Sequence, residues 1–165
     1  MAEGTSEAPV EFDRFFEDEY PRLVRALYLI TANPGEAEDL VQEAMARVYA
    51  RWDRVREMAS PAGYVYKTAL NIHRKRLRRV ALTLRTLLPG SDSGDPASDV
   101  ALRSDVARAL QALPQGQRVA LVLTEWMGLS TKEAAAILGI QVGAVRVRLH
   151  RARAALRDSL GGSHE

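Results

Sequence analysis

The sequence predicts an all-α protein made of two small helical domains joined by a flexible linker. Apolar residues recur at spacings of three and four along most of the 165 residues, which is the pattern of amphipathic helices. No stretch is a convincing β-strand. The pattern stops at Pro89–Ser98, written PGSDSGDPAS, whose glycine, proline, serine and aspartate content is typical of a linker. We therefore expect a disordered leader at 1–10, a first domain at 11–86, the linker at 87–98, a second domain at 99–160 and a tail at 161–165.

Composition argues against several classes of function. The chain has no cysteine and only three histidines, so a disulfide, thiolate catalysis and a cysteine zinc site are impossible, and no metal site is expected. Without a glycine-rich phosphate loop or a nucleophile paired with a histidine, we expect neither an enzyme nor a bound cofactor. No apolar run approaches the length of a membrane span, and the N-terminus lacks the apolar core of a signal peptide. The expectation is a cytoplasmic protein without membrane insertion.

The net charge of +2 conceals a strong segregation of charge along the chain. Residues 1–20 carry seven acidic side chains and one arginine, and residues 36–43 carry four acids and no base. Residues 58–91 carry seven bases and no acid. These alternating blocks predict two kinds of partner surface, a polyanion for the basic blocks and a basic surface for the acidic ones.

Two helices are predicted at the start of the first domain. The first begins at Phe12 and should be bent or restarted by Pro21, and a turn follows at Asn33–Gly35. The second runs from Glu36 to about Trp52 and has one broad apolar stripe. Opposite this stripe lie Asp39, Gln42, Glu43 and Ala46. Periodicity alone also fits an ordinary solvated acidic face.

A third helix follows the predicted loop Asp53–Ala59. Ser60 should cap it, with Pro61 at the first helical position. The face opposite its apolar stripe carries an aromatic ring, an amide and several cations, namely Tyr64, Lys67, Asn71, Lys75 and Arg78. These groups can stack on bases, hydrogen-bond to base edges and contact phosphates, so the face suits nucleic acid. An ordinary solvated basic face fits the same pattern.

In the second domain, helices near Asp99–Ala112 and Gln115–Met127 form the platform for a predicted helix-turn-helix at Leu129–Arg157. Ser130 resembles an N-cap, with Glu133 three residues later as in a capping box, and Gly139 can adopt the left-handed conformation of a tight turn. The last helix has an apolar stripe at Val142, Val145, Leu149, Ala152 and Leu156. Opposite this stripe or beside it lie Gly143, Arg146, Val147, Arg148, His150 and Arg151. Such a basic face can enter a DNA major groove, although an ordinary helix pair with a solvated basic face is the alternative.

Three motifs together resemble those of the extracytoplasmic-function (ECF) sigma factors of bacterial RNA polymerase, which contain domains two and four joined by a linker. AEDLVQEAMARVYARW (Ala37–Trp52) is similar to the family's polymerase-binding helix. SPAGYVYKTALN (Ser60–Asn71) is similar to its promoter-melting helix, with the pattern Pro-x-x-Trp-Leu-Tyr-Arg-x-Ala-x-Asn. LPQGQRVALVL (Leu113–Leu123), continuing into the helix-turn-helix, is similar to domain four. The resemblance covers about residues 12–160, with the order and spacing of the family.

The resemblance implies a promoter-specificity subunit that binds core RNA polymerase and promoter DNA and directs transcription initiation. It implies that Asp39, Gln42 and Glu43 contact the clamp coiled coil of the largest polymerase subunit. It also implies that the loop 53–59 captures a flipped base of the −10 element beside Asn71. The implied −10 contacts are Tyr64, Lys67, Asn71, Lys75 and Arg78, and the implied −35 contacts are Arg146, Val147, Arg148, His150 and Arg151.

The sequence departs from the family pattern at two positions of the promoter-melting helix. Tyr64 stands where tryptophan is usual, and Thr68 replaces a typical aliphatic residue. The alternative function is a stand-alone helix-turn-helix regulator, which would have no reason to keep a separate acidic polymerase-binding helix. We expect regulation from outside the chain, by an anti-sigma protein or another external regulator.

Overall fold

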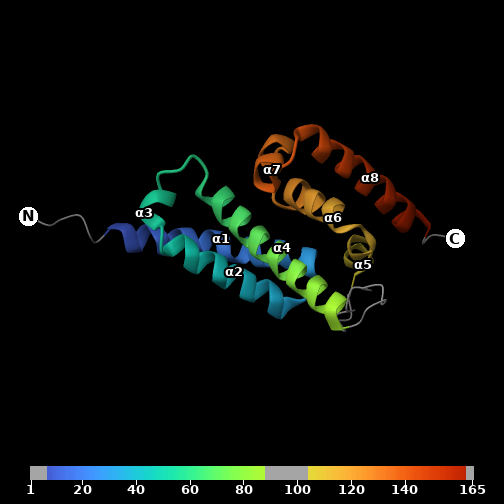
Figure 1. Cartoon of the computed structure of the whole chain (residues 1–165). Helices are drawn as coiled ribbons and strands as arrows, with labels where there is room; N and C mark the ends of the chain where they lie inside the picture. Colours follow the sequence, from blue (N-terminus) through green and yellow to red (C-terminus); the bar gives the residue numbers. More distant parts are fainter. Residues whose placement is uncertain (1–6, 88–103, 163–165) are drawn as a thin grey trace, which may run out of the picture.

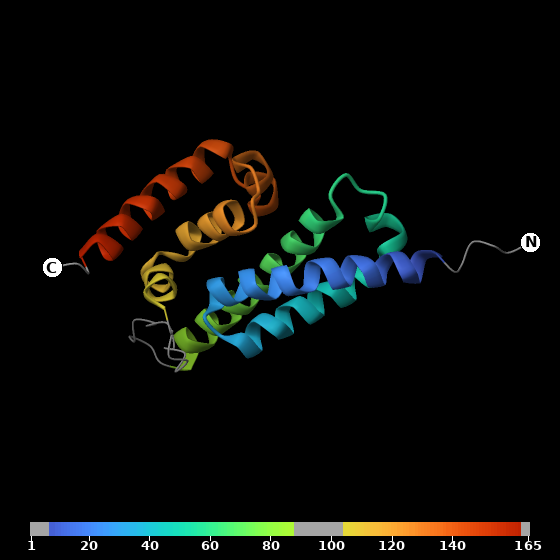
Figure 2. The same ribbon diagram turned by 180° about the vertical axis from the view of Figure 1, so that it is seen from behind.

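The computed structural model describes residues 7–87 and 104–162, and within these ranges every regular element is helical, as predicted. Residues 1–6, 88–103 and 163–165, which include most of the predicted leader, linker and tail, lie outside the described residues. The helices form two bundles, α1–α4 and α5–α8, which pack side by side (Figures 1 and 2).

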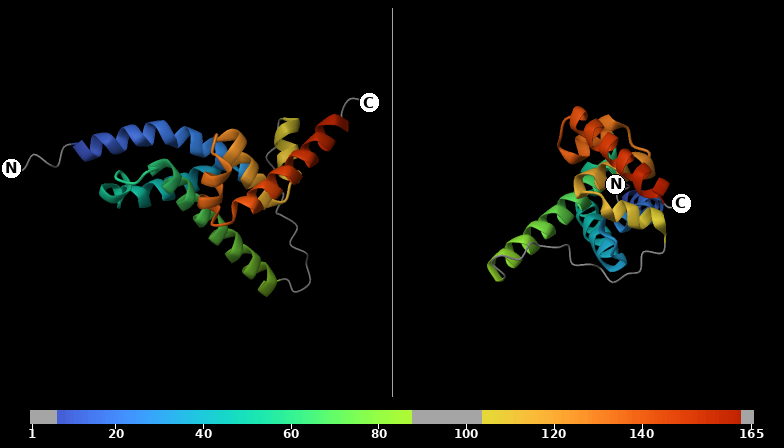
Figure 3. Two further views of the ribbon diagram at one scale, coloured as in Figure 1. Left: turned by 90° about the horizontal axis from the view of Figure 1, so that it is seen from above. Right: turned by 90° about the vertical axis from the view of Figure 1, so that its right-hand side faces the viewer.

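The first bundle consists of α1 (Glu7–Thr31), α2 (Pro34–Tyr49), the short α3 (Trp52–Val55) and α4 (Pro61–Leu87). α1 begins within the segment predicted to be a disordered leader, and it runs through Pro21 as one helix. Pro21 is exposed, whereas Leu23 and Leu27 are buried in the core. The backbone hydrogen bond that proline removes is therefore on the solvent side, and the helix curves without a break (Figure 3).

Side-chain caps start α2 and α4. Asn33 Oδ1 accepts the amide of Glu36 at 3.1 Å, and Pro34 occupies the first turn. Ser60 Oγ accepts the amide of Gly63 at 3.0 Å, so the predicted cap is confirmed. The apolar stripes of α1, α2 and α4 meet in a core whose largest fully buried side chains are Leu27, Ile30, Leu40, Val41, Val48, Val55 and Val65.

The segment Asp53–Ala59, expected to be a loop, contains most of the helical turn α3. This turn forms because Trp52 and Val55 are both buried and hold it against the core. The Trp52 ring packs edge-on against Phe12, with 5.3 Å between the ring centroids. α4 continues past the core to Leu87, and its last turns project from the bundle (Figure 3).

The second bundle consists of α5 (Asp105–Ala112), α6 (Gln115–Leu121), the π-helix η1 (Val122–Trp126), α7 (Thr131–Leu138) and α8 (Val142–Gly161). α5 starts at Asp105 because Ser104 Oγ caps it, accepting the amide of Ala107 at 3.1 Å. The predicted start of this helix near residue 99 lies outside the described residues. The helix predicted over 115–127 is divided into α6 and the π-helical turn.

α7 and α8 form the predicted helix-turn-helix. Ser130 Oγ accepts the amide of Glu133 at 3.1 Å, and Glu133 Oε2 accepts the amide of Ser130 at 2.7 Å, which completes the capping box. Gly139 ends α7 with a φ of 67°, the left-handed conformation that the sequence predicts. α8 buries the middle of its predicted stripe, Val145, Leu149 and Ala152.

Candidate nucleic-acid interfaces

The polar face of α4 borders a hollow of about 370 Å³ in the first bundle. Tyr64, Asn71 and Lys75 line this hollow, whereas Lys67 and Arg78 are exposed on α4 outside its lining. The structure therefore brings together three of the five predicted −10 contacts. The full lining is Arg47, Ala50, Arg51, Tyr64, Thr68, Asn71 and Lys75, with three cations and no carboxylate.

Two of the lining cations were not expected from the sequence: Arg47 in the last turn of α2, and Arg51 between α2 and α3. Arg51 is exposed, and its Nη1 lies 3.5 Å from the Tyr64 hydroxyl. Arg47 is also exposed and lies four residues earlier, in the last turn of α2. Their spacing was visible in the sequence, but their position beside α4 depends on how the two helices pack. Thr68 was noted only as a departure from the family pattern, and its hydroxyl donates to the Tyr64 carbonyl at 2.7 Å.

The polar face of α2 is divided by the packing of α4 against it. Asp39 and Gln42 are exposed, as a surface for a partner requires. Glu43 is only partly exposed, because its carboxylate accepts from Arg47 at 2.6 Å and from Arg76 of α4 at 2.7 Å. The Arg76 hydrogen bond is the largest influence that lowers the pKa of Glu43, and Arg47 adds to it. Glu43 thus belongs to the contact between α2 and α4, which we call the α2–α4 seam.

Four of the five predicted −35 contacts are exposed on the outward face of α8. Arg146, Val147, His150 and Arg151 are exposed, and Val147 keeps 48% of its surface accessible although it is apolar. An exposed valine between arginines is suited to contact a thymine methyl group in a major groove.

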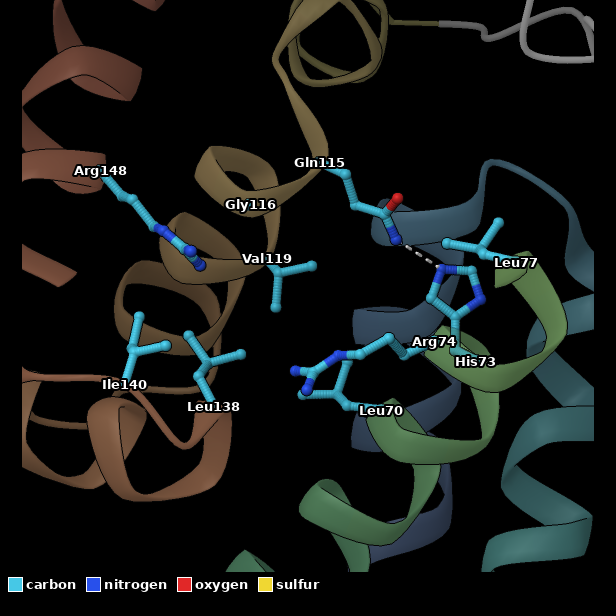
Figure 4. A pocket seen from close by; sticks show the side chains of 10 residues that line it. All are labelled: Leu70, His73, Arg74, Leu77, Gln115, Gly116, Val119, Leu138, Ile140 and Arg148. Carbon is cyan, nitrogen blue, oxygen red and sulfur yellow. Dashed lines mark hydrogen bonds between the residues drawn. The ribbon is translucent and has the colours of Figure 1, made fainter. Parts of the chain in front are cut away.

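Arg148 is the exception, because its side chain is partly buried in a groove of about 350 Å³ between the two bundles. Figure 4 shows it extending from α8 toward α6. A Cβ atom on Gly116 would lie only 3.2 Å from its guanidinium, so the glycine permits this close approach. On the other side of the groove lie His73 and Arg74 of α4.

Other kinds of site are not found among residues 7–87 and 104–162. In these ranges no helix is long and apolar enough to cross a membrane, and no group of three acidic or histidine side chains is placed to hold a metal ion.

Comparisons with known proteins assign each of the two bundles to a protein family. Residues 15–101 match the family Sigma-70 region 2, and residues 103–156 match Sigma-70, region 4. The chain is 32% identical over 153 residues to the RNA polymerase sigma-E factor of Streptomyces coelicolor, covering 92% of this chain and 86% of that protein. It is also 32% identical to the ECF RNA polymerase sigma factor SigE of Mycolicibacterium smegmatis, covering 96% of this chain and 65% of that protein.

A solved structure gives the same assignment for the whole fold. The sigma factor RpoE from Bartonella quintana, in complex with the anti-sigma factor NepR, is similar with a TM-score of 0.77 and 25% sequence identity. The match covers 93% of this chain and 99% of that chain.

The first bundle has a cation-lined hollow, and the second has an exposed helix-turn-helix. Together these two features define a bipartite DNA-binding protein. With the matches to both sigma-70 regions, the chain belongs to the ECF sigma factors. Members of this family are transcription initiation factors rather than enzymes.

Proposed function

We propose that the chain is a promoter-specificity subunit that binds core RNA polymerase in the cytoplasm and directs transcription initiation. It recognises the −35 element with α8 and recognises and opens the −10 element with α4. The observation that carries this proposal is the presence, in one chain, of a cation-lined hollow on α4 and an exposed helix-turn-helix on a separate bundle. A stand-alone regulator needs only the second of these surfaces.

The hollow in the first bundle suits one unpaired nucleotide of the −10 element. Its volume of about 370 Å³ falls in the range of about 300–1,000 Å³ that is typical of small-ligand sites. Tyr64 offers a ring for stacking, and the Asn71 amide can both donate to and accept from a base edge. Arg47 and Arg51 lie beside these two groups, where they can contact the flanking phosphates.

The −35 element is a duplex, and α8 has the exposed cations that a major-groove helix needs. Arg146 and Arg151 can each donate two hydrogen bonds to O6 and N7 of a guanine, and Val147 can pack on a thymine methyl. The contacts to polymerase are assigned to Asp39 and Gln42, which are exposed on α2.

Regulation by an anti-sigma protein is part of the proposal. It is supported by the similarity to RpoE, whose solved structure is a complex with the anti-sigma factor NepR.

The experiment that tests this assignment is promoter opening by holoenzyme carrying Tyr64→Ala. Without the ring, the unpaired base loses a stacking partner worth about 1–3 kcal/mol, so the permanganate-reactive open complex should decrease at a linear promoter. A template with a pre-melted bubble should largely restore run-off transcription, because strand opening is then no longer required. Tyr64→Phe keeps the ring and serves as the control, with near-normal opening expected.

Two outcomes would contradict the proposal at different levels. If the bubble template does not restore activity to Tyr64→Ala, the residue does not act in strand opening. If the unmodified chain neither co-purifies with core polymerase nor supports run-off transcription, the chain is not a promoter-specificity subunit.

A further inference from the structure

Arg51 is held in place by the corner between α2 and α3. α2 ends at Tyr49 and α3 begins at Trp52, so Arg51 lies in the short connection between these helices. The Arg51 amide donates to the Val48 carbonyl at 3.0 Å. Val48 and Trp52 are both buried, which fixes the backbone on either side of Arg51. The local fold therefore places an exposed arginine side chain in the lining of the hollow.

The Tyr64 hydroxyl gives the Arg51 side chain an acceptor. Arg51 Nη1 lies 3.5 Å from this oxygen, and among residues 7–87 and 104–162 no carboxylate forms an ion pair with Arg51. A tryptophan ring, which the family pattern favours at position 64, has only an N–H donor and could not accept a hydrogen bond from Arg51. The tyrosine of this chain therefore supplies the oxygen that orients the guanidinium.

The two arginines of the lining differ in what their charges already contact. Arg47 Nη2 donates to Glu43 Oε1 at 2.6 Å, so a carboxylate partly neutralises its charge. A guanidinium has several N–H donors, and only one donor of Arg51 is used by Tyr64. Two parallel N–H groups of one guanidinium can also bind two acceptors at once. Arg51 is therefore the arginine of the hollow that has donors available for a ligand.

The hollow as a whole offers charged donors and only neutral acceptors. Lys75 and the two arginines are cations, and the lining contains no carboxylate. The side-chain acceptors are the oxygens of Tyr64, Thr68 and Asn71. A hydrogen bond with a charged donor is roughly twice as strong as one between neutral groups. A base that presents a carbonyl oxygen to this lining should therefore bind more tightly than one that presents an amino group.

The four bases divide into two classes by this criterion. Guanine presents the acceptors O6 and N7, and thymine presents the acceptor O4. Adenine and cytosine present the amino groups N6 and N4, whose hydrogens would face the cations of the hollow. The Asn71 amide can donate or accept, so it does not separate the two classes.

We infer that Arg51 determines base specificity in the −10 element, by selecting a base with a carbonyl group, guanine or thymine, at the unpaired position held in the hollow. This inference rests on the proposed function, because it requires the hollow to hold an unpaired base. It gives Arg51 a contact to the base itself. A contact to a flanking phosphate would carry no sequence information.

The test first locates the captured position without reference to base identity. Holoenzyme is titrated with a fluorescent fork-junction template of a promoter that it opens, and binding is followed by anisotropy. Each unpaired position of the non-template strand is made abasic in turn. The captured position is the one at which loss of the base weakens binding by the parent but has little effect on Tyr64→Ala, because this variant has already lost the stacking partner.

At the captured position the four bases are then compared. The parent should bind guanine or thymine roughly 10-fold more tightly than adenine or cytosine. Arg51→Ala should reduce this preference to about two-fold or less. Arg51→Glu should reverse it, because a carboxylate accepts from the amino group of cytosine. A template with 7-deazaguanine separates the two carbonyl bases, since loss of N7 weakens binding only where guanine is read through both acceptors.

The matched control is Lys67→Ala, which removes an exposed cation of α4 outside the lining of the hollow. It should weaken binding to all four bases by the same factor, because a phosphate contact does not distinguish them. Circular dichroism of the Arg51 variants should match that of the parent, since Arg51 is exposed.

Three outcomes would overturn the inference while the chain remained a promoter-specificity subunit. These are a parent preference for adenine or cytosine, a preference that persists in Arg51→Ala, and the absence of any unpaired position coupled to Tyr64. A holoenzyme that opens no promoter would instead overturn the proposed function, and the role of Arg51 with it.

Discussion

At the scale of single residues, the arginines of α8 differ in their surroundings although they are close in sequence. Arg151 is exposed on the face opposite the buried stripe, where it can donate two hydrogen bonds to one guanine. Arg148 is partly buried beside Gly116, at the edge of the helix. A contact to a base edge carries sequence information, whereas a contact to a phosphate does not.

We predict that Arg151→Ala and Arg148→Ala will have different effects on −35 recognition by the holoenzyme. Arg151→Ala should reduce the preference among single-base variants, because a bidentate guanine contact contributes about 1–3 kcal/mol of discrimination. Arg148→Ala should weaken binding to all variants equally and lower the salt slope by about one unit. The measurement is binding across a panel of −35 variants at several salt concentrations. An unchanged preference profile for Arg151→Ala would show that α8 does not lie in the groove as proposed.

At the scale of elements, the packing of α4 on α2 separates residues that share one face in the sequence. Asp39 and Gln42 face solvent, whereas Glu43 connects Arg47 of its own helix to Arg76 of α4. A substitution at Glu43 therefore perturbs the α2–α4 seam as well as any partner contact. Of these three residues, only Asp39 and Gln42 can be changed without affecting the packing of α4 on α2.

We predict that Asp39→Ala combined with Gln42→Ala will weaken binding to core polymerase by about 10-fold, since two polar contacts at about 0.5–1.5 kcal/mol each are lost. The urea unfolding curve should not change. Glu43→Lys should lower the unfolding midpoint instead, because it places a third cation beside Arg47 and Arg76. Core affinity is measured by fluorescence anisotropy of labelled chain. Full affinity in the double variant would place the polymerase contact on another surface.

At the scale of the whole molecule, His73 of the first bundle is buried where the two bundles meet. Its Nδ1 lies 3.5 Å from Glu36 Oε1, and its Nε2 faces the Gln115 amide of the second bundle. Burial is the main cause that lowers the pKa of His73; Glu36 opposes this, and Arg118 and Arg76 add to it. Over a range of pH, the His73 ring is therefore neutral in the folded chain but protonated in the unfolded chain.

We predict that this histidine makes the free energy of unfolding decrease as the pH falls. In the unfolded chain the pKa is near 6.5, so below this pH the unfolded state binds a proton that the folded state does not. The contribution of neutral His73 to the free energy of unfolding is fully present above about pH 6.5. It is lost as the pH falls toward the lower pKa of the folded state, by at most about 1.4 kcal/mol per pH unit. Urea unfolding at pH 7.5 and 5.5 should show a smaller decrease for His73→Gln than for the parent. Equal decreases would contradict the prediction.

The sequence by itself determined the features that depend on neighbouring residues. The periodicity of apolar residues gave the helices, and the capping box at Ser130 and the left-handed turn at Gly139 were predicted correctly because both use interactions within a few residues. The sequence predicted that Pro21 would bend or restart the first helix, whereas α1 continues through Pro21 as one helix, because the effect of a proline depends on which side of the helix faces solvent. Three motifs in order and at the family's spacing were sufficient to indicate the ECF sigma factors.

Tertiary structure alone decided which distant residues meet. It placed Arg47 and Arg51 beside Tyr64, paired Glu43 with Arg76, and partly buried Arg148 between the two bundles. It also brought Arg118 of the second bundle to the end of α1, a contact that spans 88 residues of sequence. The physical reason is that a helical pattern shows which face of a helix is polar, whereas its neighbour depends on how the apolar stripes of several helices pack together.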